Sequence, residues 1–163
     1  MATTCPMGFD VGALRAQVLA TYDRVARDPT GDFHFHRGLR YAADYLRYDA
    51  DALASLPEAC TARFAGVGNP LRIGPIHPGE TVLDHACGAG MDLLLAARRV
   101  GSRGRAVGID MTPAMRDVAR STQQSGTVGS VHCRRDAGTR IGRACARAPV
   151  PGCAHHGALR LLS

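Results

Sequence analysis

An apolar strand that leads directly into a glycine turn is the feature that most constrains this fold. Residues 81–86, Thr-Val-Leu-Asp-His-Ala, are typical of a strand buried on both faces, and Gly88-Ala89-Gly90 is typical of a tight turn. The pattern then predicts a helix from Met91 to Val100 and a second short strand from Ala106 to Asp110. Because this order joins parallel strands by a right-handed crossover, the centre of the chain predicts an α/β fold.

The first 65 residues predict a small helical layer. Asp10 can cap a helix that runs to about Asp28, and a second helical pattern covers 38–48. Residues 55–58, Ser-Leu-Pro-Glu, match a capping box, which predicts a third helix ending at Gly66. Three tyrosines fall on one face of the second pattern at helical spacing, Tyr41, Tyr45 and Tyr48. We expect that face to pack against the neighbouring layer, although these tyrosines and Tyr22 are also candidates to cover a ligand.

The periodic pattern fades after residue 121. Thr112 and Pro113 open a helix before that point, and residues 128–135 are compatible with a third strand. From Thr139 onward there is neither a helical nor a strand period. Residues 121–163 carry six arginines and one aspartate, so they contribute +5 of the chain's net charge of +6. We expect this basic tail to be disordered or loosely docked.

These patterns divide the chain into three expected parts. Residues 1–75 form a helical N-terminal lid and linker, residues 76–138 a partial Rossmann-like domain, and residues 139–163 a basic, disordered tail. The predicted fold class is therefore α/β, a Rossmann-like core with an incomplete parallel sheet, preceded by a small helical layer.

Several classes of protein are disfavoured by the sequence. No run of 18 apolar residues is present, and the N-terminus lacks the pattern of a secretory signal, so we expect a cytoplasmic protein without a membrane partner. The basic tail lacks aromatic residues for base stacking, which argues against a nucleic-acid partner. Cys133, Cys145 and Cys153 with His155 and His156 lack the short spacing of zinc ligands, so we expect no metal site.

The strand–turn–helix segment also carries the candidate chemistry. Small residues after the first strand let a ligand approach the backbone, and the following helix offers free N–H groups there. Asp110 lies twenty residues after Gly90 and ends the second strand, where an acid can bind both hydroxyls of a ribose. The pattern is therefore typical of a nucleotide-containing cofactor.

Two residues distinguish between the candidate cofactors. A dinucleotide fingerprint needs a third glycine at position 93, which is Leu93 here. Asp84, just before the turn, would repel a pyrophosphate but would attract a positively charged amino group. These residues favour S-adenosylmethionine, while a dinucleotide-binding Rossmann protein remains an alternative.

The segment 82–90, Val-Leu-Asp-His-Ala-Cys-Gly-Ala-Gly, resembles the first motif of class I S-adenosylmethionine-dependent methyltransferases, usually V-L-D-x-G-x-G-x-G. Residues 107–113, Val-Gly-Ile-Asp-Met-Thr-Pro, resemble their second motif. Residues 55–58, 64–70 and 79–84 add to this resemblance. Together these segments resemble most the arsenite methyltransferase-like group and its relatives among ubiquinone and menaquinone methyltransferases. The resemblance implies methyl transfer to a small-molecule acceptor, arsenite being one candidate.

The resemblance also implies a set of cofactor-binding residues. Asp84 would hold the methionine ammonium, Asp110 the ribose hydroxyls and Met111 the adenine, while Asp136 would contact the adenine amino group. The resemblance does not imply a catalytic residue. The full expected set is Asp84, Ala86, Cys87, Gly88, Ala89, Gly90, Asp110, Met111 and Asp136.

Three departures from the family pattern bear on function. Val67 stands where arsenite methyltransferases usually carry a cysteine, and His85 stands where an apolar residue is usual. We expect His85 to be buried and hydrogen-bonded rather than catalytic. Only two clear strands and one further candidate replace the usual seven, so we expect a truncated or frameshifted member. A vestigial cofactor-binding protein without catalysis is therefore a second hypothesis.

Overall fold

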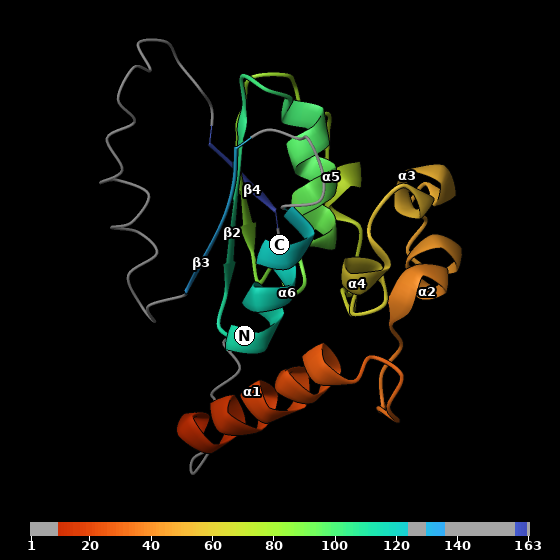
Figure 1. Cartoon of the computed structure of the whole chain (residues 1–163), viewed down its shortest axis with the longest axis vertical. Coiled ribbons are helices and arrows are strands. Elements are labelled where there is room, and N and C mark those ends of the chain that lie inside the picture. Colours follow the sequence, from red (N-terminus) through yellow and green to blue (C-terminus); the bar gives the residue numbers. More distant parts are fainter. Residues whose placement is uncertain (1–9, 124–129, 136–158, 163) are drawn as a thin grey trace, which may run out of the picture.

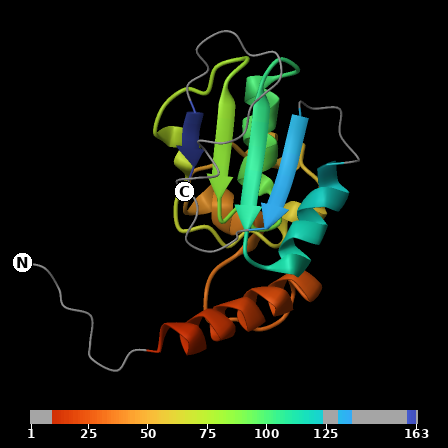
Figure 2. The ribbon, with the colours of Figure 1, turned by 90° about the vertical axis from the view of Figure 1, so that its left-hand side faces the viewer.

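A four-stranded parallel sheet forms the centre of the molecule. The computed structural model describes residues 10–123, 130–135 and 159–162. The strands are β1 (Thr81–His85), β2 (Arg105–Asp110), β3 (Ser130–Arg135) and β4 (Leu159–Leu162). Their order across the sheet is β3-β2-β1-β4, and all three pairings are parallel (Figure 2). This confirms the predicted α/β class with a Rossmann-like core.

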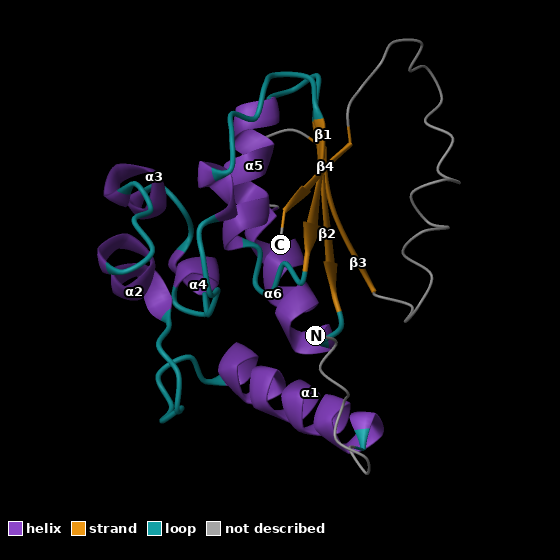
Figure 3. Cartoon of the chain, turned by 180° about the vertical axis from the view of Figure 1, so that it is seen from behind, coloured by secondary structure: helices purple, strands orange, loops and turns teal. Residues whose placement is uncertain are grey.

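Apart from the first helix, the described helices lie together on one side of the sheet, and the first helix crosses beyond the end of the strands (Figures 1 and 3). The helices α5 (Met91–Val100) and α6 (Pro113–Gln123) pack directly on the strands. Outside them lie the short helices α2 (Gly38–Asp44), α3 (Ala50–Ala54) and α4 (Glu58–Thr61), while α1 (Val11–Arg27) lies against α6. A 3₁₀ turn, η1 (Pro70–Arg72), connects this helical layer to the sheet.

The main hydrophobic core joins the helical layer to the sheet. It is continuous from Val25 on α1 and Leu53 on α3 to Val82 on β1 and Met91 on α5. The aromatic residues lie entirely in the N-terminal half of the sequence, and Tyr48 and Phe64 contribute buried rings to this core. The helical layer therefore shares its core with the Rossmann-like part.

Two predicted helices agree closely with the structure. Asp10 caps α1 by accepting the backbone N–H of Ala13 over 2.9 Å, and α1 ends at Arg27. The helix α5 has the bounds expected from its apolar run, Met91 to Val100. Both predictions succeeded because a local signal, a cap or a glycine turn, marks where each helix begins.

The prediction for 38–48 was partly wrong. The helix α2 ends at Asp44, and Arg47 adopts a left-handed backbone angle, φ +57°. The three tyrosines therefore do not share one face. Tyr45 is 72% exposed, whereas Tyr48 lies beyond the helix and is only 6% exposed. Burial of Tyr48 against Phe64 ends the helical run that the spacing suggested.

The predicted capping box is absent from the structure. The Ser55 hydroxyl donates to the carbonyl of Ala52, at the end of α3, and does not cap the next helix. Pro57 is the N-cap of α4 and makes no side-chain capping bond. The helix α4 ends at Thr61 rather than at Gly66. A helix that the sequence analysis missed, α3, occupies the preceding residues and captures Ser55 instead.

The C-terminal region contains one expected strand and one unexpected strand. Residues 130–135 form β3, within the segment 128–135 that was compatible with a third strand. Leu159–Leu162, within the tail predicted to be disordered, form β4 and pair with β1. The four residues of β4 are too few to show a strand period in the sequence. Pairing is explained by the apolar edge of β1, where Leu162 becomes buried.

Gly104 lies where the loop after α5 meets the start of β2, and we predict that it tolerates no side chain. A Cβ there would lie 2.7 Å from the carbonyl oxygen of Val100 and 2.8 Å from that of Glu80. We expect Gly104→Ala to lower the free energy of unfolding by about 1–3 kcal/mol in urea titrations. The control is Gly68→Ala, because a Cβ at Gly68 meets no atom within 4 Å. An equal loss in both variants would contradict this packing argument.

Candidate functional site

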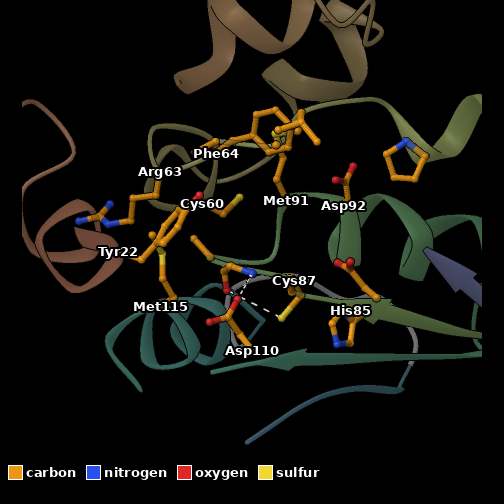
Figure 4. Close-up of a pocket in the computed structure, with 18 of the residues that line it drawn as sticks. Tyr22, Cys60, Arg63, Phe64, His85, Cys87, Met91, Asp92, Asp110 and Met115 are labelled. Carbon is orange, nitrogen blue, oxygen red and sulfur yellow. Dashed lines mark hydrogen bonds between the residues drawn. The ribbon is translucent and has the colours of Figure 1, made fainter. Parts of the chain in front are cut away.

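A cavity of about 540 Å³ opens at the carboxyl ends of β1 and β2. This is where parallel α/β sheets bind ligands, and the volume is in the range of small-molecule sites. Its floor comes from the turns after the two strands, and its walls come from α1, α4, α5 and the segment 63–73 (Figure 4). The floor residues are Asp84, His85, Ala86, Cys87, Gly88, Ala89, Asp110, Met111 and Thr112.

The turn after β1 depends on three residues with positive φ. Ala86, Gly88 and Gly90 have φ angles of +61°, +51° and +90°. Gly90 is the N-cap of α5, so the turn delivers the chain directly into the helix. A Cβ on Gly88 would meet no atom within 4 Å, so its backbone, not a crowded neighbour, requires the glycine.

Asp110 connects the two turns of the floor. Its Oδ2 accepts the backbone N–H of Gly88 over 2.8 Å, and its Oδ1 accepts that of Thr112 over 2.7 Å. The Arg116 guanidinium donates to its backbone carbonyl over 2.9 Å. The residue is 8% exposed. A carboxylate has about four acceptor positions, so these bonds leave it able to accept further donors from the cavity.

Asp84 lies within β1, next to last in the strand, and is 4% exposed. It also lines the cavity. With Asp110 it places two carboxyl groups in the cavity wall from neighbouring strands, in a partly desolvated setting. Such a wall favours a ligand with a positive charge or with several hydroxyl donors.

Asp92 and Tyr48 form a site feature that the sequence analysis missed. The Tyr48 hydroxyl donates to Asp92 Oδ1 over 2.7 Å, across 44 residues of sequence. Burial raises the pKa of Asp92 to about 6, and this bond and the charge of Arg99 offset the shift only in part. Burial and the charges of Asp92 and Asp84 raise the pKa of Tyr48. The available signal was a carboxylate in the first turn of α5, directly before the apolar run 93–97.

The opposite side of the cavity is mostly apolar. Figure 4 shows Tyr22 and Arg63 on the side away from Asp92 and His85. Arg63 Nε donates to the carbonyl of Ala26, so its guanidinium holds the end of α1 while its stem lines the cavity. Tyr22 was a candidate to cover a ligand, and it does line this cavity.

The structure gathers most of the expected cofactor-binding residues into one wall. Seven of them line the cavity: Asp84, Ala86, Cys87, Gly88, Ala89, Asp110 and Met111. Gly90 does not line it but shapes the turn, and Asp136 lies outside the described residues. The expectation that His85 is buried was wrong. His85 is the last residue of β1, is partly exposed and contributes to the cavity lining.

The part of the chain that the structure describes contains neither a metal-binding cluster nor a helix that could span a membrane. In those residues no group of three or more His, Cys, Asp or Glu side chains is arranged to hold a metal ion. Cys145, Cys153, His155 and His156 lie outside that part, as does the side chain of Cys133. None of the described helices has both the length and the apolar character needed to span a membrane.

The acidic side chains of the cavity fit an S-adenosyl cofactor better than a dinucleotide. The carboxyl groups of Asp84 and Asp92 suit an ammonium group, and Asp110 suits ribose hydroxyls. A pyrophosphate would instead meet these acids beside the start of α5. The residues at the floor of the cavity are therefore compatible with the charge pattern of S-adenosylmethionine.

Comparisons with known proteins show which proteins this chain is similar to. Residues 76–137 match a family model described as a methyltransferase domain. An arsenite methyltransferase from Halobacterium salinarum is 41% identical over 92 residues, which cover 56% of this chain and 23% of that protein. Residues 76–137 are therefore similar to a methyltransferase domain.

Two further proteins are similar to parts of this chain. A 2-phytyl-1,4-naphtoquinone methyltransferase from Nostoc is 44% identical over 48 residues, 29% of this chain and 21% of that protein. The crystal structure of an arsenic(III) S-adenosylmethionine methyltransferase from Chlamydomonas reinhardtii is 33% identical, with a TM-score of 0.44, covering 52% of this chain and 30% of that one. The chain spans less than a quarter of the length of the curated relatives that it matches.

We predict that Asp92 makes stability depend on pH. Its pKa is about 6 in the folded protein against an ordinary 3.8, so the folded state holds its proton more tightly. This contribution to the free energy of unfolding is full below pH 4 and is lost as the pH rises to about 6. Asp92→Asn should remove that loss, which amounts to at most about 3 kcal/mol at about 1.4 kcal/mol per pKa unit.

The measurement is urea unfolding of the wild type and Asp92→Asn at pH 4, 5, 6 and 7. The stability of the variant relative to the wild type should rise across this range. Asp117→Asn, at an exposed acid on α6, is the control and should show no comparable trend. A constant difference between Asp92→Asn and the wild type would show that burial does not perturb this carboxyl group.

Proposed function

We propose that this methyltransferase domain binds S-adenosylmethionine in the cavity at the ends of β1 and β2 and serves methyl transfer to a small-molecule acceptor. The observation that carries the proposal is the Asp110 carboxylate, which joins the Gly88 turn to the Thr112 turn beneath that cavity. When bound, the cofactor supplies a sulfonium methyl group open to attack by a nucleophile. The small-molecule acceptor and a cytoplasmic location remain predictions.

Each floor residue has a proposed role. Asp84 attracts the ammonium group, and Asp110 accepts the ribose hydroxyls. Met111 lies against the adenine, and Ala86, Gly88 and Gly90 bring the backbone close to the cofactor. Cys87 and Ala89 are small residues of the same turn. Because the resemblance names no catalytic base, the chain's contribution to the reaction is to bind and orient the reacting groups.

Arsenite is the acceptor that we propose within this class. The similarity to the Halobacterium arsenite methyltransferase supports it. A second support is the chemistry of the walls, since every sulfur-bearing side chain that the structure describes lines the cavity: Cys60, Cys87, Met91, Met111 and Met115. Trivalent arsenic is a soft, thiophilic centre, so sulfur-rich walls favour it over a hard acceptor.

The cofactor roles predict a pattern of binding losses. S-adenosylhomocysteine and methylthioadenosine share the adenosine part, but only the first carries the amino-acid end. Asp110→Asn should weaken both ligands by about tenfold or more, consistent with the loss of a charge-assisted hydrogen bond. Asp84→Asn should weaken only S-adenosylhomocysteine. Isothermal titration calorimetry measures both, with Asp117→Asn as an exposed control.

Circular dichroism of each variant shows whether the loss of binding comes from unfolding. A folded wild-type protein that binds neither ligand would overturn the proposed cofactor site. Equal losses of both ligands in Asp84→Asn would remove its assignment to the ammonium group.

If the chain catalyses methyl transfer to arsenite, a label on the methyl group of the cofactor should appear in the arsenic product. With methyl-labelled S-adenosylmethionine, a thiol reductant and arsenite, the wild type should release labelled methylated arsenic, and Asp110→Asn should release at least tenfold less. Chromatography of the products measures both. Binding of S-adenosylhomocysteine without any labelled product would instead support a cofactor-binding protein that does not catalyse the reaction.

A further inference from the structure

A hydrogen bond between the helical layer and the cofactor turn involves a carboxylate that no motif assigns. The Tyr48 hydroxyl, from the segment between α2 and α3, donates to Asp92 Oδ1 in the first turn of α5 over 2.7 Å. The same hydroxyl lies 3.2 Å from the carbonyl oxygen of Gly68. Because a phenol donates one proton, the shorter bond to the carboxylate is the stronger interaction.

Asp92 is presented to the cavity as well as to Tyr48. It lines the same cavity as Asp84, and Figure 4 shows it on the opposite side from Tyr22. Among the described residues, only Tyr48 donates a hydrogen bond to Asp92, and that bond uses Oδ1. The second oxygen is therefore available to a ligand donor.

The carboxyl groups of Asp84 and Asp92 come from two different elements, and both act on the Tyr48 hydroxyl. Both charges act on the Tyr48 hydroxyl and raise its pKa, after the larger effect of burial. One carboxyl group comes from β1 and the other from α5, on either side of the glycine turn. The Asp92 carboxylate is costly to hold in this buried setting, since the charge of Arg99 on α5 compensates for its burial only in part.

We propose that Asp92, oriented by Tyr48, is a second carboxylate for the ammonium group of the cofactor's amino-acid end. The inference rests on the proposed cofactor site. Asp92 is then a binding residue, and Tyr48 is a positioning residue that acts through it. Tyr48 also makes cofactor binding depend on docking of the helical layer, because its ring packs on Phe64 in that layer.

Ligand selectivity distinguishes this role from a structural one. Asp92→Asn should raise the Kd of S-adenosylhomocysteine about tenfold at pH 7.5 and leave that of methylthioadenosine within about twofold, as expected for a charge-assisted bond lost from one ligand only. Titration calorimetry of the full chain measures both. Asp51→Asn, an exposed acid in the first turn of α3, is the matched control.

The pH dependence gives a second readout. In the wild type, the preference for S-adenosylhomocysteine over methylthioadenosine should decline as the pH falls through about 6, where Asp92 takes up a proton. Tyr48→Phe removes a bond that lowers the pKa of Asp92, so the decline should move to higher pH. The groups around Asp92 are Tyr48, Asp84 and Arg99, and His85 shares the cavity. His85→Gln is the control and should leave the midpoint unchanged, because the proposal assigns this pH dependence to Asp92.

Three outcomes would overturn the proposal. They are equal weakening of both ligands in Asp92→Asn, no weakening of either, and an unchanged pH midpoint in Tyr48→Phe. If Asp92→Asn fails to fold by circular dichroism, the Tyr48→Phe midpoint decides alone. If the wild type binds both ligands and Asp110→Asn loses them while Asp92→Asn has no selective effect, the cofactor site stands and only this inference fails.

Discussion

The two hydrogen bonds accepted by Asp110 are the interaction on which the site depends. They tie the turn after β1 to the turn after β2, through the backbone N–H groups of Gly88 and Thr112. The backbone N–H of Cys87 adds a third link, because it donates to the carbonyl of Ile109 at the end of β2 over 3.0 Å. Because the two bonds to Asp110 involve a carboxylate that is 8% exposed, they are stronger than neutral bonds in water. The floor of the cavity is therefore preorganised before any ligand arrives.

The helical layer closes this floor through a small number of polar contacts. Tyr48 reaches Asp92, and Arg98 on α5 donates to the Ser55 carbonyl over 2.7 Å. Within the layer itself, Arg63 holds the end of α1. Each contact joins residues more than 35 positions apart. The shared apolar core supplies the attraction between the layers, while these directional bonds fix how the layers meet. Cofactor binding and docking of the helical layer are expected to be coupled for this reason.

The charge distribution of the cavity follows from the same architecture. Parallel strands end at one edge, so acids at the ends of β1 and β2 gather at one side, and the first turn of α5 adds a third. The other walls are apolar and rich in sulfur. A ligand with a cationic end, ribose hydroxyls and a soft reactive centre matches this division.

Local sequence signals predicted much of the fold. The cap at Asp10, the glycine turn before Met91 and the acid at the end of β2 each act within a few residues, so the bounds of α1 and α5 and the position of Asp110 followed from them. The capping box at Ser55 failed because a competing helix took the serine hydroxyl. The tyrosine face failed because burial of Tyr48 stopped the helix at Asp44.

By itself, the sequence determined the β-α-β order, the cofactor turn and the two acids of its motifs, since these depend on neighbours along the chain. Only the tertiary structure decided that Tyr48 meets Asp92 and that Leu159–Leu162 pair with β1. Both contacts join segments more than 40 residues apart. Such contacts depend on how apolar faces pack and on which strand edge is left open, and no local spacing records either.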